Sequence, residues 1–165
     1  MLLRHAISVA ILPFTVVVLI PYWIARRYDV VPGLGHLPGS IMLQLAGILV
    51  FALGFALFVG SMRRFATEGK GTLAPWDPPR VFVASGPYRF VRNPMISGVI
   101  FMLCGEALAL LSLRHAAWAA FCVVLNLIYI PLFEEPQLRR RFGASYEEYY
   151  RHVPRFIPRL TPWSV

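Results

Sequence analysis

Four apolar blocks dominate this chain and limit what it can fold into. They cover residues 6–25, 41–62, 95–113 and 116–133, and each is close to the roughly 20 residues that a helix needs to cross about 30 Å of hydrocarbon. With 58% hydrophobic and 15% charged residues, a soluble monomer of this composition would expose large apolar patches, which is rare. Because lipid cannot satisfy an open backbone, helices are the expected elements. We therefore expect one all-α domain over residues 1–165, a polytopic membrane protein with about four transmembrane helices.

The first block could also be the hydrophobic part of a signal peptide. It is long for such a segment, contains Pro13 and Pro21, and is followed by Arg26 and Arg27 without a small-residue cleavage site. We expect an uncleaved first span that is bent at Pro13, a distortion that neighbouring helices can absorb in a membrane.

The basic residues are distributed unequally between the two sides of this arrangement. Three of the sixteen Lys and Arg residues, namely Arg26, Arg27 and Arg114, fall on one side, and the others fall before the first block, in the loop 63–94 or in the tail 134–165. The positive-inside rule then predicts that both termini, the loop and the tail are cytoplasmic. The net charge of +8 is thus interleaved with apolar blocks, which favours anionic lipid headgroups over nucleic acid as the partner.

Two further features concern packing. The helical spacing of Ala52, Ala56 and Gly60 predicts a face for close helix contact on the second span. Only residues 113–115 separate the third and fourth spans, so these spans are expected to form a tight antiparallel hairpin.

The tail and the cysteines complete the structural predictions. Apolar and aromatic residues recur at near-helical spacing in residues 134–165, with a break at Gly143, which predicts a C-terminal amphipathic cap of short helices on the cytosolic surface. Cys104 and Cys122 lie in apolar blocks without the spacing of a disulfide framework or a zinc site. We interpret both as small buried hydrophobes and expect no metal site.

A first polar segment precedes the predicted hairpin. Residues 86–94 lead directly into the third span and end in Asn93-Pro94, with Arg89 and Arg92 just before it. These arginines could simply anchor the helix at the headgroups. Alternatively, Asn93 caps the helix and the segment offers backbone N–H groups and arginines to a polar or anionic ligand.

A second polar segment follows the hairpin and begins with Glu134 and Glu135. These carboxylates could start a helix that has Pro136 in its first turn, and Glu135 could pair with Arg139 four residues on. Alternatively, one carboxylate accepts hydrogen bonds from a ligand. Because the hairpin returns the chain to the same membrane face, we expect both polar segments to meet there and form a pocket open to the bilayer.

Glu106 is expected near the centre of the third span, where a charge is costly and usually paired or functional. Asn126 in the fourth span is a candidate hydrogen-bond partner across the hairpin. The alternative is that these two residues line a substrate cavity.

The two polar segments carry a resemblance to a known family. Residues 86–98 (GPYRFVRNPMISG) and 134–158 (EEPQLRRRFGASYEEYYRHVPRFIP) resemble the isoprenylcysteine carboxyl methyltransferase and phospholipid methyltransferase group. In that group an arginine-histidine-proline motif precedes a span, and paired glutamates with a leucine three residues on follow the next. The resemblance covers about the second half of the chain, and the first two spans show no motif.

This resemblance implies a multi-pass enzyme that uses S-adenosylmethionine at the cytosolic face, with a small-molecule, lipid or prenylated acceptor arriving from the membrane. Carried over by motif, the residues of the cofactor site would be Tyr88, Arg92, Asn93, Pro94, Met95, Gly98, Glu134, Glu135, Leu138 and Tyr149. The chain departs from the family at two places: Asn93 replaces the usual histidine, and Ile96-Ser97 stands where a tyrosine is frequent.

Methyl transfer from a sulfonium needs positioning more than acid–base chemistry. A carboxylate acceptor could be held by Arg139 or Arg155, an amine could lose its proton to Glu134 or Glu135, and arginines could lower the pKa of a thiol. The candidate catalytic residues are therefore Arg139, Arg155 and Glu134. Two other readings remain: a membrane reductase that uses NADPH, since sterol reductases resemble this family near their C-termini, and a non-catalytic membrane scaffold.

Overall fold

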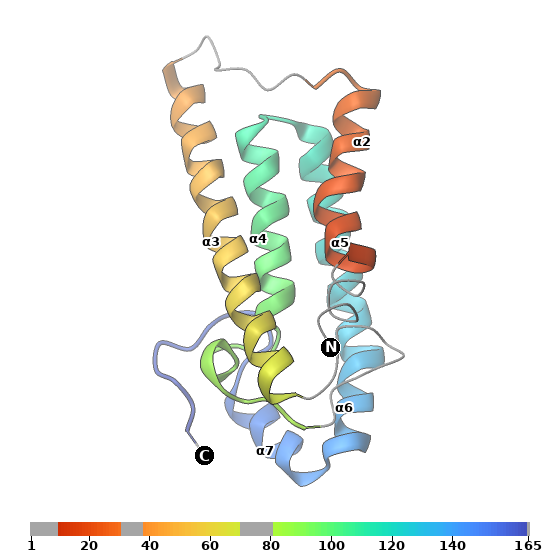
Figure 1. The fold of residues 1–165 in the computed structure, drawn as a ribbon, viewed down its shortest axis with the longest axis vertical. Coiled ribbons are helices and arrows are strands. Elements are labelled where there is room, and N and C mark those ends of the chain that lie inside the picture. The colour runs from red at the N-terminus through yellow and green to blue at the C-terminus, as the bar shows by residue number, and fades with distance from the viewer. Residues whose placement is uncertain (1–9, 31–37, 70–80, 165) are drawn as a thin grey trace.

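The structure, a computed structural model, describes residues 10–30, 38–69 and 81–164 (Figure 1). These ranges contain helices and no strand, so the prediction of an all-α fold is confirmed. The elements are π-helical η1 (Ala10–Leu19), α2 (Ile20–Arg27), α3 (Pro38–Glu68), the 3₁₀-helix η2 (Gly86–Arg89), α4 (Pro94–Ala109), α5 (Leu113–Tyr129), π-helical η3 (Ile130–Glu134), α6 (Glu135–Phe142) and α7 (Ala144–His152).

The long helices form an elongated bundle. Helices α3, α4 and α5 run side by side, and α2 lies against α5 (Figure 1). Helices α6 and α7 cover one end of the bundle, which we call the α6–α7 end, and the turn between α4 and α5 lies at the opposite end. The chain therefore passes along the bundle in both directions and brings α6 back to the start of α4.

Two helical segments, Ser40–Glu68 and Leu113–Phe142, are long and apolar enough to cross a membrane. The outer face of the first exposes Leu45, Leu49 and Leu53 by 59–61%, an apolar stripe at helical spacing that suits contact with lipid. Helix α4 has 16 residues and is shorter than a full span. The count of four spans stays a prediction, as does the orientation of the chain, and residues 6–9 and Arg4 lie outside the described residues.

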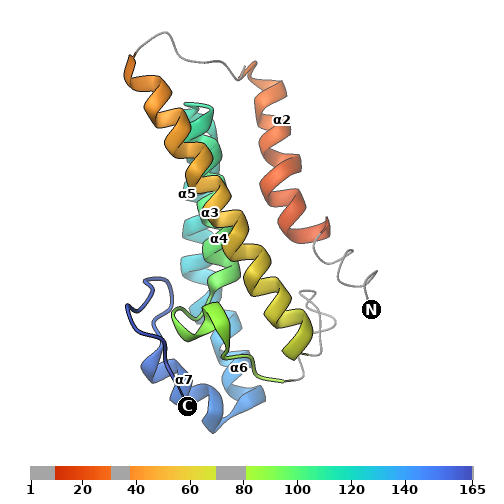
Figure 2. The ribbon, with the colours of Figure 1, turned by 60° about the vertical axis from the view of Figure 1, so that its left-hand side comes forward.

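The first helix is irregular around Pro13, which lies within the π-helical stretch. A proline removes one backbone hydrogen bond and distorts the turn around it, in line with the predicted bend. Figure 2 shows that α2 stands apart from α3. Two side chains of α5 hold η1 and α2 against the bundle. Trp118 Nε1 donates to the carbonyl of Val16 in η1 (3.1 Å), and His115 Nε2 lies 3.2 Å from that of Pro21 in α2.

Helices α3 and α4 make the most extensive contact in the bundle, and glycines allow their backbones to approach closely. A Cβ on Gly54 would lie 2.7 Å from the carbonyl oxygen of Gly98, and one on Gly105 would lie 2.7 Å from that of Gly47.

The predicted contact face on the second span was wrong. Among the described residues, no atom lies within 4 Å of the Cβ position of Gly60, and Ala52 and Ala56 are exposed. Spacing alone selected the wrong face because Ala52 and Ala56 lie on the side of α3 that points away from α4.

The hairpin turn lies earlier than residues 113–115. Helix α4 ends at Ala109, Leu111 adopts a positive φ of 48°, and α5 begins at Leu113. Ser112 is the N-cap residue, and its hydroxyl accepts from the backbone N–H of His115. An N-cap serine favours helix initiation directly after it, so the residues expected in the turn form the first turn of α5.

The end of α6 coincides with the predicted break. Gly143 has a φ of 55°, a conformation that glycine adopts without strain, and α7 starts directly after it. Helix α7 buries Tyr146 and Tyr149, which pack with Val153 in a small core of their own. This core supports the segments that form the candidate functional site at the α6–α7 end.

Candidate functional site

The two polar segments that flank the hairpin meet at the α6–α7 end. The first runs through η2 into Asn93, the N-cap position of α4, although the Asn93 side chain makes no capping hydrogen bond. The second begins where η3 passes into α6 at Glu134 and Glu135, with Pro136 in the first turn of α6. Arg92 Nη2 lies 3.3 Å from Glu135 Oε1, so the prediction that the hairpin brings the two segments together is confirmed.

Glu135 is the buried centre of a charged cluster. Arg155 Nε and Nη2 donate to its Oε1 and Oε2, both at 2.7 Å, and Arg92 adds the longer contact. The Glu135 side chain is only 6% exposed, and a buried carboxylate is tolerated only when it is paired. The hydrogen bonds from Arg155 to Glu135 also raise the pKa of Arg155.

The pair expected between Glu135 and Arg139 is not made. Arg139 instead binds Glu147 (Nε to Oε2, 3.2 Å) and lies over the ring of Tyr150 at 4.2 Å. Arg155, which is distant in sequence, takes both carboxylate oxygens of Glu135. Because a bidentate arginine–carboxylate pair is stronger than a single contact along a helix, the tertiary partner replaces the local one.

Arg155 reaches Glu135 because the tail is fastened along the loop before α4. The backbone N–H of Arg92 donates to the carbonyl of Pro154, that of Arg159 to Phe90 and that of Trp163 to Arg89, each at 2.9 Å. Arg89 Nε also donates to the carbonyl of Trp163 at 2.6 Å. The loop and the tail thus run in opposite directions side by side, and the cluster around Glu135 lies between them and α6.

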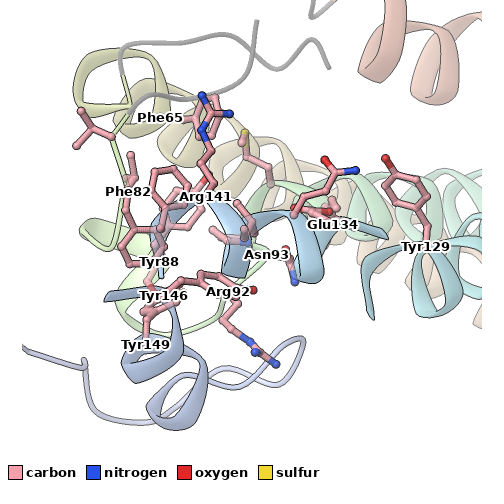
Figure 3. Close-up of a pocket in the computed structure, with 18 of the residues that line it drawn as sticks. Phe65, Phe82, Tyr88, Arg92, Asn93, Tyr129, Glu134, Arg141, Tyr146 and Tyr149 are labelled. Carbon is pink, nitrogen blue, oxygen red and sulfur yellow. Dashed lines mark hydrogen bonds between the residues drawn. The ribbon is translucent and has the colours of Figure 1, made fainter. Parts of the chain in front are cut away.

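A cavity of about 460 Å³ lies beside this cluster, within the usual range of ligand pockets, about 300–1,000 Å³. Figure 3 shows aromatic residues gathered at one end, Tyr129 at the other, and Glu134 on the wall nearer Tyr129. Glu134, Gln137, Arg92, Asn93 and Arg141 supply polar groups to a largely apolar lining. The members contributed by the bundle helices are Leu12, Pro13, Phe58, Phe65, Pro94, Met95, Ile96, Val99 and Tyr129.

The aromatic end of the cavity contains buried donors. Tyr149 donates its hydroxyl hydrogen to the carbonyl of Tyr88 at 2.7 Å. The hydroxyl of Tyr88, together with Nε and Nη1 of Arg92, has no hydrogen-bond partner among the described residues. Burial raises the pKa of Tyr88, so its hydroxyl keeps its proton and can donate to a ligand.

The residues expected at the cofactor site divide into two groups. Those that line the cavity are Tyr88, Arg92, Asn93, Pro94, Met95, Glu134, Leu138 and Tyr149. Glu135 lies behind the wall in its charged cluster, and Gly98 packs against α3, where a Cβ would lie 2.8 Å from the backbone nitrogen of Phe58. Among the expected catalytic residues, Glu134 lines the cavity, whereas Arg139 and Arg155 do not.

Glu106 and Asn126 do not line the cavity, and they do not meet. Helix α4 ends at Ala109, so Glu106 lies in its last turn and not at the centre of a span. Asn126 lies in the last turn of α5 and donates its amide to the carbonyl of Cys122 at 2.8 Å. The ends of antiparallel neighbours lie at opposite ends of a hairpin, so the predicted contact between these residues was wrong.

Sequence reasoning missed several residues of the cavity. Arg141, on the far side of α6 from the cluster, lines the cavity together with Phe65, Phe82 and Phe142. Phe82 packs edge-on against Tyr146 and Tyr149, with ring centroids 5.8 and 5.0 Å apart. Phe65 and Phe82 lie outside both motif segments, and a basic run such as 139–141 does not reveal which arginine faces a cavity.

Comparison with known proteins now adds to this geometry. The sequence pattern of the phospholipid methyltransferase family matches residues 42–145, from the start of α3 to the start of α7, and so includes both polar segments. The chain belongs to this family. The resemblance found in the two motifs is therefore confirmed. The family match ends before Tyr149 and Arg155, so the tail that pairs with Glu135 lies beyond it.

A similar protein is methanethiol S-methyltransferase 2 of Bradyrhizobium diazoefficiens, which is 36% identical over 73 residues. The match covers 44% of this chain and 27% of that relative, so the chain accounts for about a quarter of the relative's length. No solved structure matches the chain.

Proposed function

We propose that this protein transfers a methyl group from S-adenosylmethionine to a lipophilic acceptor at the cytosolic face of a membrane. The observation that carries the proposal is the cavity itself. It joins polar and aromatic side chains of the α6–α7 end to apolar side chains of the bundle helices. A polar cofactor and an apolar acceptor could therefore occupy one cavity from opposite ends.

The lining residues fit such a cofactor. Tyr88 and Arg92 offer buried donors without a partner among the described residues, and aromatic rings beside them suit a nucleoside. Glu134 places a carboxyl group on the same wall, which suits a cationic centre. S-adenosylmethionine supplies, when bound, a methyl group on a positively charged sulfur that needs no further activation.

The same lining favours an acceptor that arrives with a proton. Arg139 and Arg155, which could have held an acceptor carboxylate, are paired with Glu147 and Glu135 outside the cavity. Glu134 would repel a carboxylate but could accept the proton of an amine or a thiol. The proton would move to the Glu134 carboxylate, and the lone pair that it leaves would form the new bond to the methyl carbon. The bond from that carbon to sulfur would break at the same time, with its electron pair going to sulfur in the departing S-adenosylhomocysteine.

Of these two classes we favour a thiol. The relative from Bradyrhizobium diazoefficiens is named for S-methylation of methanethiol, a small apolar thiol. The bundle end of this cavity is lined by side chains such as Phe58, Val99 and Tyr129, which suit an apolar substituent. The reductase and scaffold readings have no comparable support.

The test uses the full chain in lipid nanodiscs with S-adenosylmethionine labelled in its methyl group. Apolar thiols, amines and carboxylic acids are offered in turn, and the methylated products are identified by mass spectrometry. We expect thiol methylation, and Glu134→Gln should lower kcat by about 10²-fold or more, a larger effect than on the Kd for the cofactor. The matched control is Glu147→Gln, an exposed carboxylate paired with Arg139, which should retain full activity. Methylation of carboxylates alone, or unchanged kcat in Glu134→Gln, would contradict the proposal.

A further inference from the structure

In the charged cluster behind the cavity, one arginine is only partly paired with the shared carboxylate. Two guanidinium groups, those of Arg92 and Arg155, share the single carboxylate of Glu135. Arg155 occupies both oxygens at 2.7 Å, whereas Arg92 makes one contact through Nη2 at 3.3 Å. These three side chains together carry an excess positive charge, and Arg92, the less fully paired of the two arginines, lines the cavity.

The remaining donors of Arg92 are buried and unsatisfied. Its side chain is 8% exposed, and neither Nε nor Nη1 has a hydrogen-bond partner among the described residues. Its guanidinium lies 4.0 Å from the ring centroid of Tyr150, which stabilises the cation but accepts no conventional hydrogen bond. The hydroxyl of Tyr88, also 8% exposed, lacks a partner as well. Buried donors of this kind are rare in native proteins, and each calls for an acceptor.

We propose that this end of the cavity binds the carboxylate at the amino-acid end of S-adenosylmethionine, through Arg92 and Tyr88. The inference rests on the proposed function, because it assigns an orientation to the cofactor in that same cavity. A carboxylate has only acceptors and a negative charge, so it matches both the orphaned donors and the excess charge. A neutral ligand group would satisfy the donors but not the charge.

This orientation also agrees with the rest of the lining. Figure 3 shows Tyr88 well separated from Tyr129, with Glu134 on the wall toward Tyr129. With the carboxylate at Arg92 and Tyr88, Glu134 would face the cationic sulfur. The apolar side chains of the bundle helices would then line the part of the cavity left for the acceptor.

Arg155 has a distinct role in this arrangement as a positioning residue. Without it, both oxygens of Glu135 would be free to accept from Nε and Nη2 of Arg92, since a bidentate pair is the preferred geometry of an arginine with a carboxylate. Arg92 would then lose a donor, and the positive charge that it offers the ligand would be neutralised. By holding Glu135 from the tail, Arg155 keeps Arg92 available to the cavity.

The experiment measures binding, without turnover, to the full chain in nanodiscs. Two probes are compared by calorimetry: S-adenosylmethionine and decarboxylated S-adenosylmethionine, which lacks only the carboxylate. The wild type should bind the complete cofactor about tenfold to a hundredfold more tightly, the range expected for a charged hydrogen bond. Arg92→Lys keeps a positive charge beside Glu135 but loses the guanidinium donors, and it should abolish most of this preference. Arg151→Lys, a substitution of an exposed arginine of α7, is the matched control and should retain it.

The role of Arg155 has its own test. Arg155→Met should reduce the preference although the residue does not line the cavity, and the double variant Glu135→Gln/Arg155→Met should regain part of it, because the competing carboxylate is gone. A merely structural role would make the double variant worse than the single one. If the double variant is no better than Arg155→Met, the positioning role is overturned.

The remaining outcomes separate this inference from the proposed function. If the wild type binds neither probe, the proposed function fails. If it binds both equally, or if Arg92→Lys keeps the preference, the cofactor binds but its carboxylate lies elsewhere, and this inference is overturned. An Arg92→Lys variant that keeps the preference but loses affinity for a phospholipid acceptor would assign the site to a lipid phosphate, which also overturns it.

Discussion

The α3–α4 contact and the α6–α7 end are held together by opposite means. Between α3 and α4 the backbones touch, and glycines at positions 47, 54, 98 and 105 leave no room for a side chain. At the α6–α7 end the segments are joined by the ion pairs of Glu135 and by the aromatic packing of Tyr146 and Tyr149. The first contact is made by close backbone approach at glycines, and the second depends on charge.

The difference follows from the surroundings of each region. In lipid, apolar side chains gain nothing by leaving their neighbours, so helices associate through close packing of small residues. At the α6–α7 end, buried charges must be paired, and removing one partner is costly. The bundle is thus a rigid frame, and the site is a charged assembly fastened to one end of it. Three substitutions test this division.

The largest effect on stability is expected for Glu135→Ala. It leaves Arg92 and Arg155 close together without their shared carboxylate, and we expect the free energy of unfolding to fall by about 3–5 kcal/mol. Reversible unfolding in mixed detergent micelles measures it. Glu147→Ala removes a carboxylate that is 41% exposed, and it should cost less than about 1 kcal/mol. Equal losses in the two variants would show that the charges around Glu135 are not the main support of this end.

A smaller loss is expected at the frame. Gly98→Ala would place a Cβ 2.8 Å from the carbonyl oxygen of Gly54, so α3 and α4 must move apart, at a cost of about 1–3 kcal/mol. Gly60→Ala is the matched control, because its Cβ would meet no atom within 4 Å, and it should stabilise α3 by up to about 1 kcal/mol through helix propensity. The same unfolding assay applies. A neutral Gly98→Ala would refute close backbone contact as the basis of the frame.

The smallest effect is expected for Tyr149→Phe. This change removes the hydrogen bond from the hydroxyl to the carbonyl of Tyr88 at 2.7 Å and leaves the ring packing in place, so the loss should be about 1 kcal/mol. Thermal unfolding of the purified protein measures it, with Tyr22→Phe, an exposed residue of α2, as the neutral comparison. A loss as large as that of Glu135→Ala would mean that the hydroxyl, and not the charged cluster, fixes the loop before α4.

Several local features could be predicted because their cause is local. A run of apolar residues predicts a helix wherever its backbone must be satisfied in lipid, and the break at Gly143 follows from the conformational freedom of glycine. The meeting of the two polar segments, which the contact between Arg92 and Glu135 shows, also followed from sequence, because a short turn between two helices returns the chain to the same end. The division of labour between Glu134 and Glu135 did not follow.

That division was hidden because adjacent residues on a helix point in different directions. Glu134 lines the cavity, and Glu135 is turned toward the tail. The two glutamates have identical side chains, and their different roles become visible only when the position of Arg155 is known. For the same reason the contact face of α3 was misassigned, since several faces of that helix carry small residues and only the position of α4 selects one.

The helices, the hairpin and the family motifs could be read from the sequence, because they depend on hydrophobicity and on chain connectivity over short distances. The folded molecule was needed to show which carboxylate faces the cavity, which arginine neutralises the other, and which glycines touch. Those outcomes depend on the direction of each side chain relative to segments that are distant in the chain. Sequence spacing measures distance along the chain, and it does not give that direction.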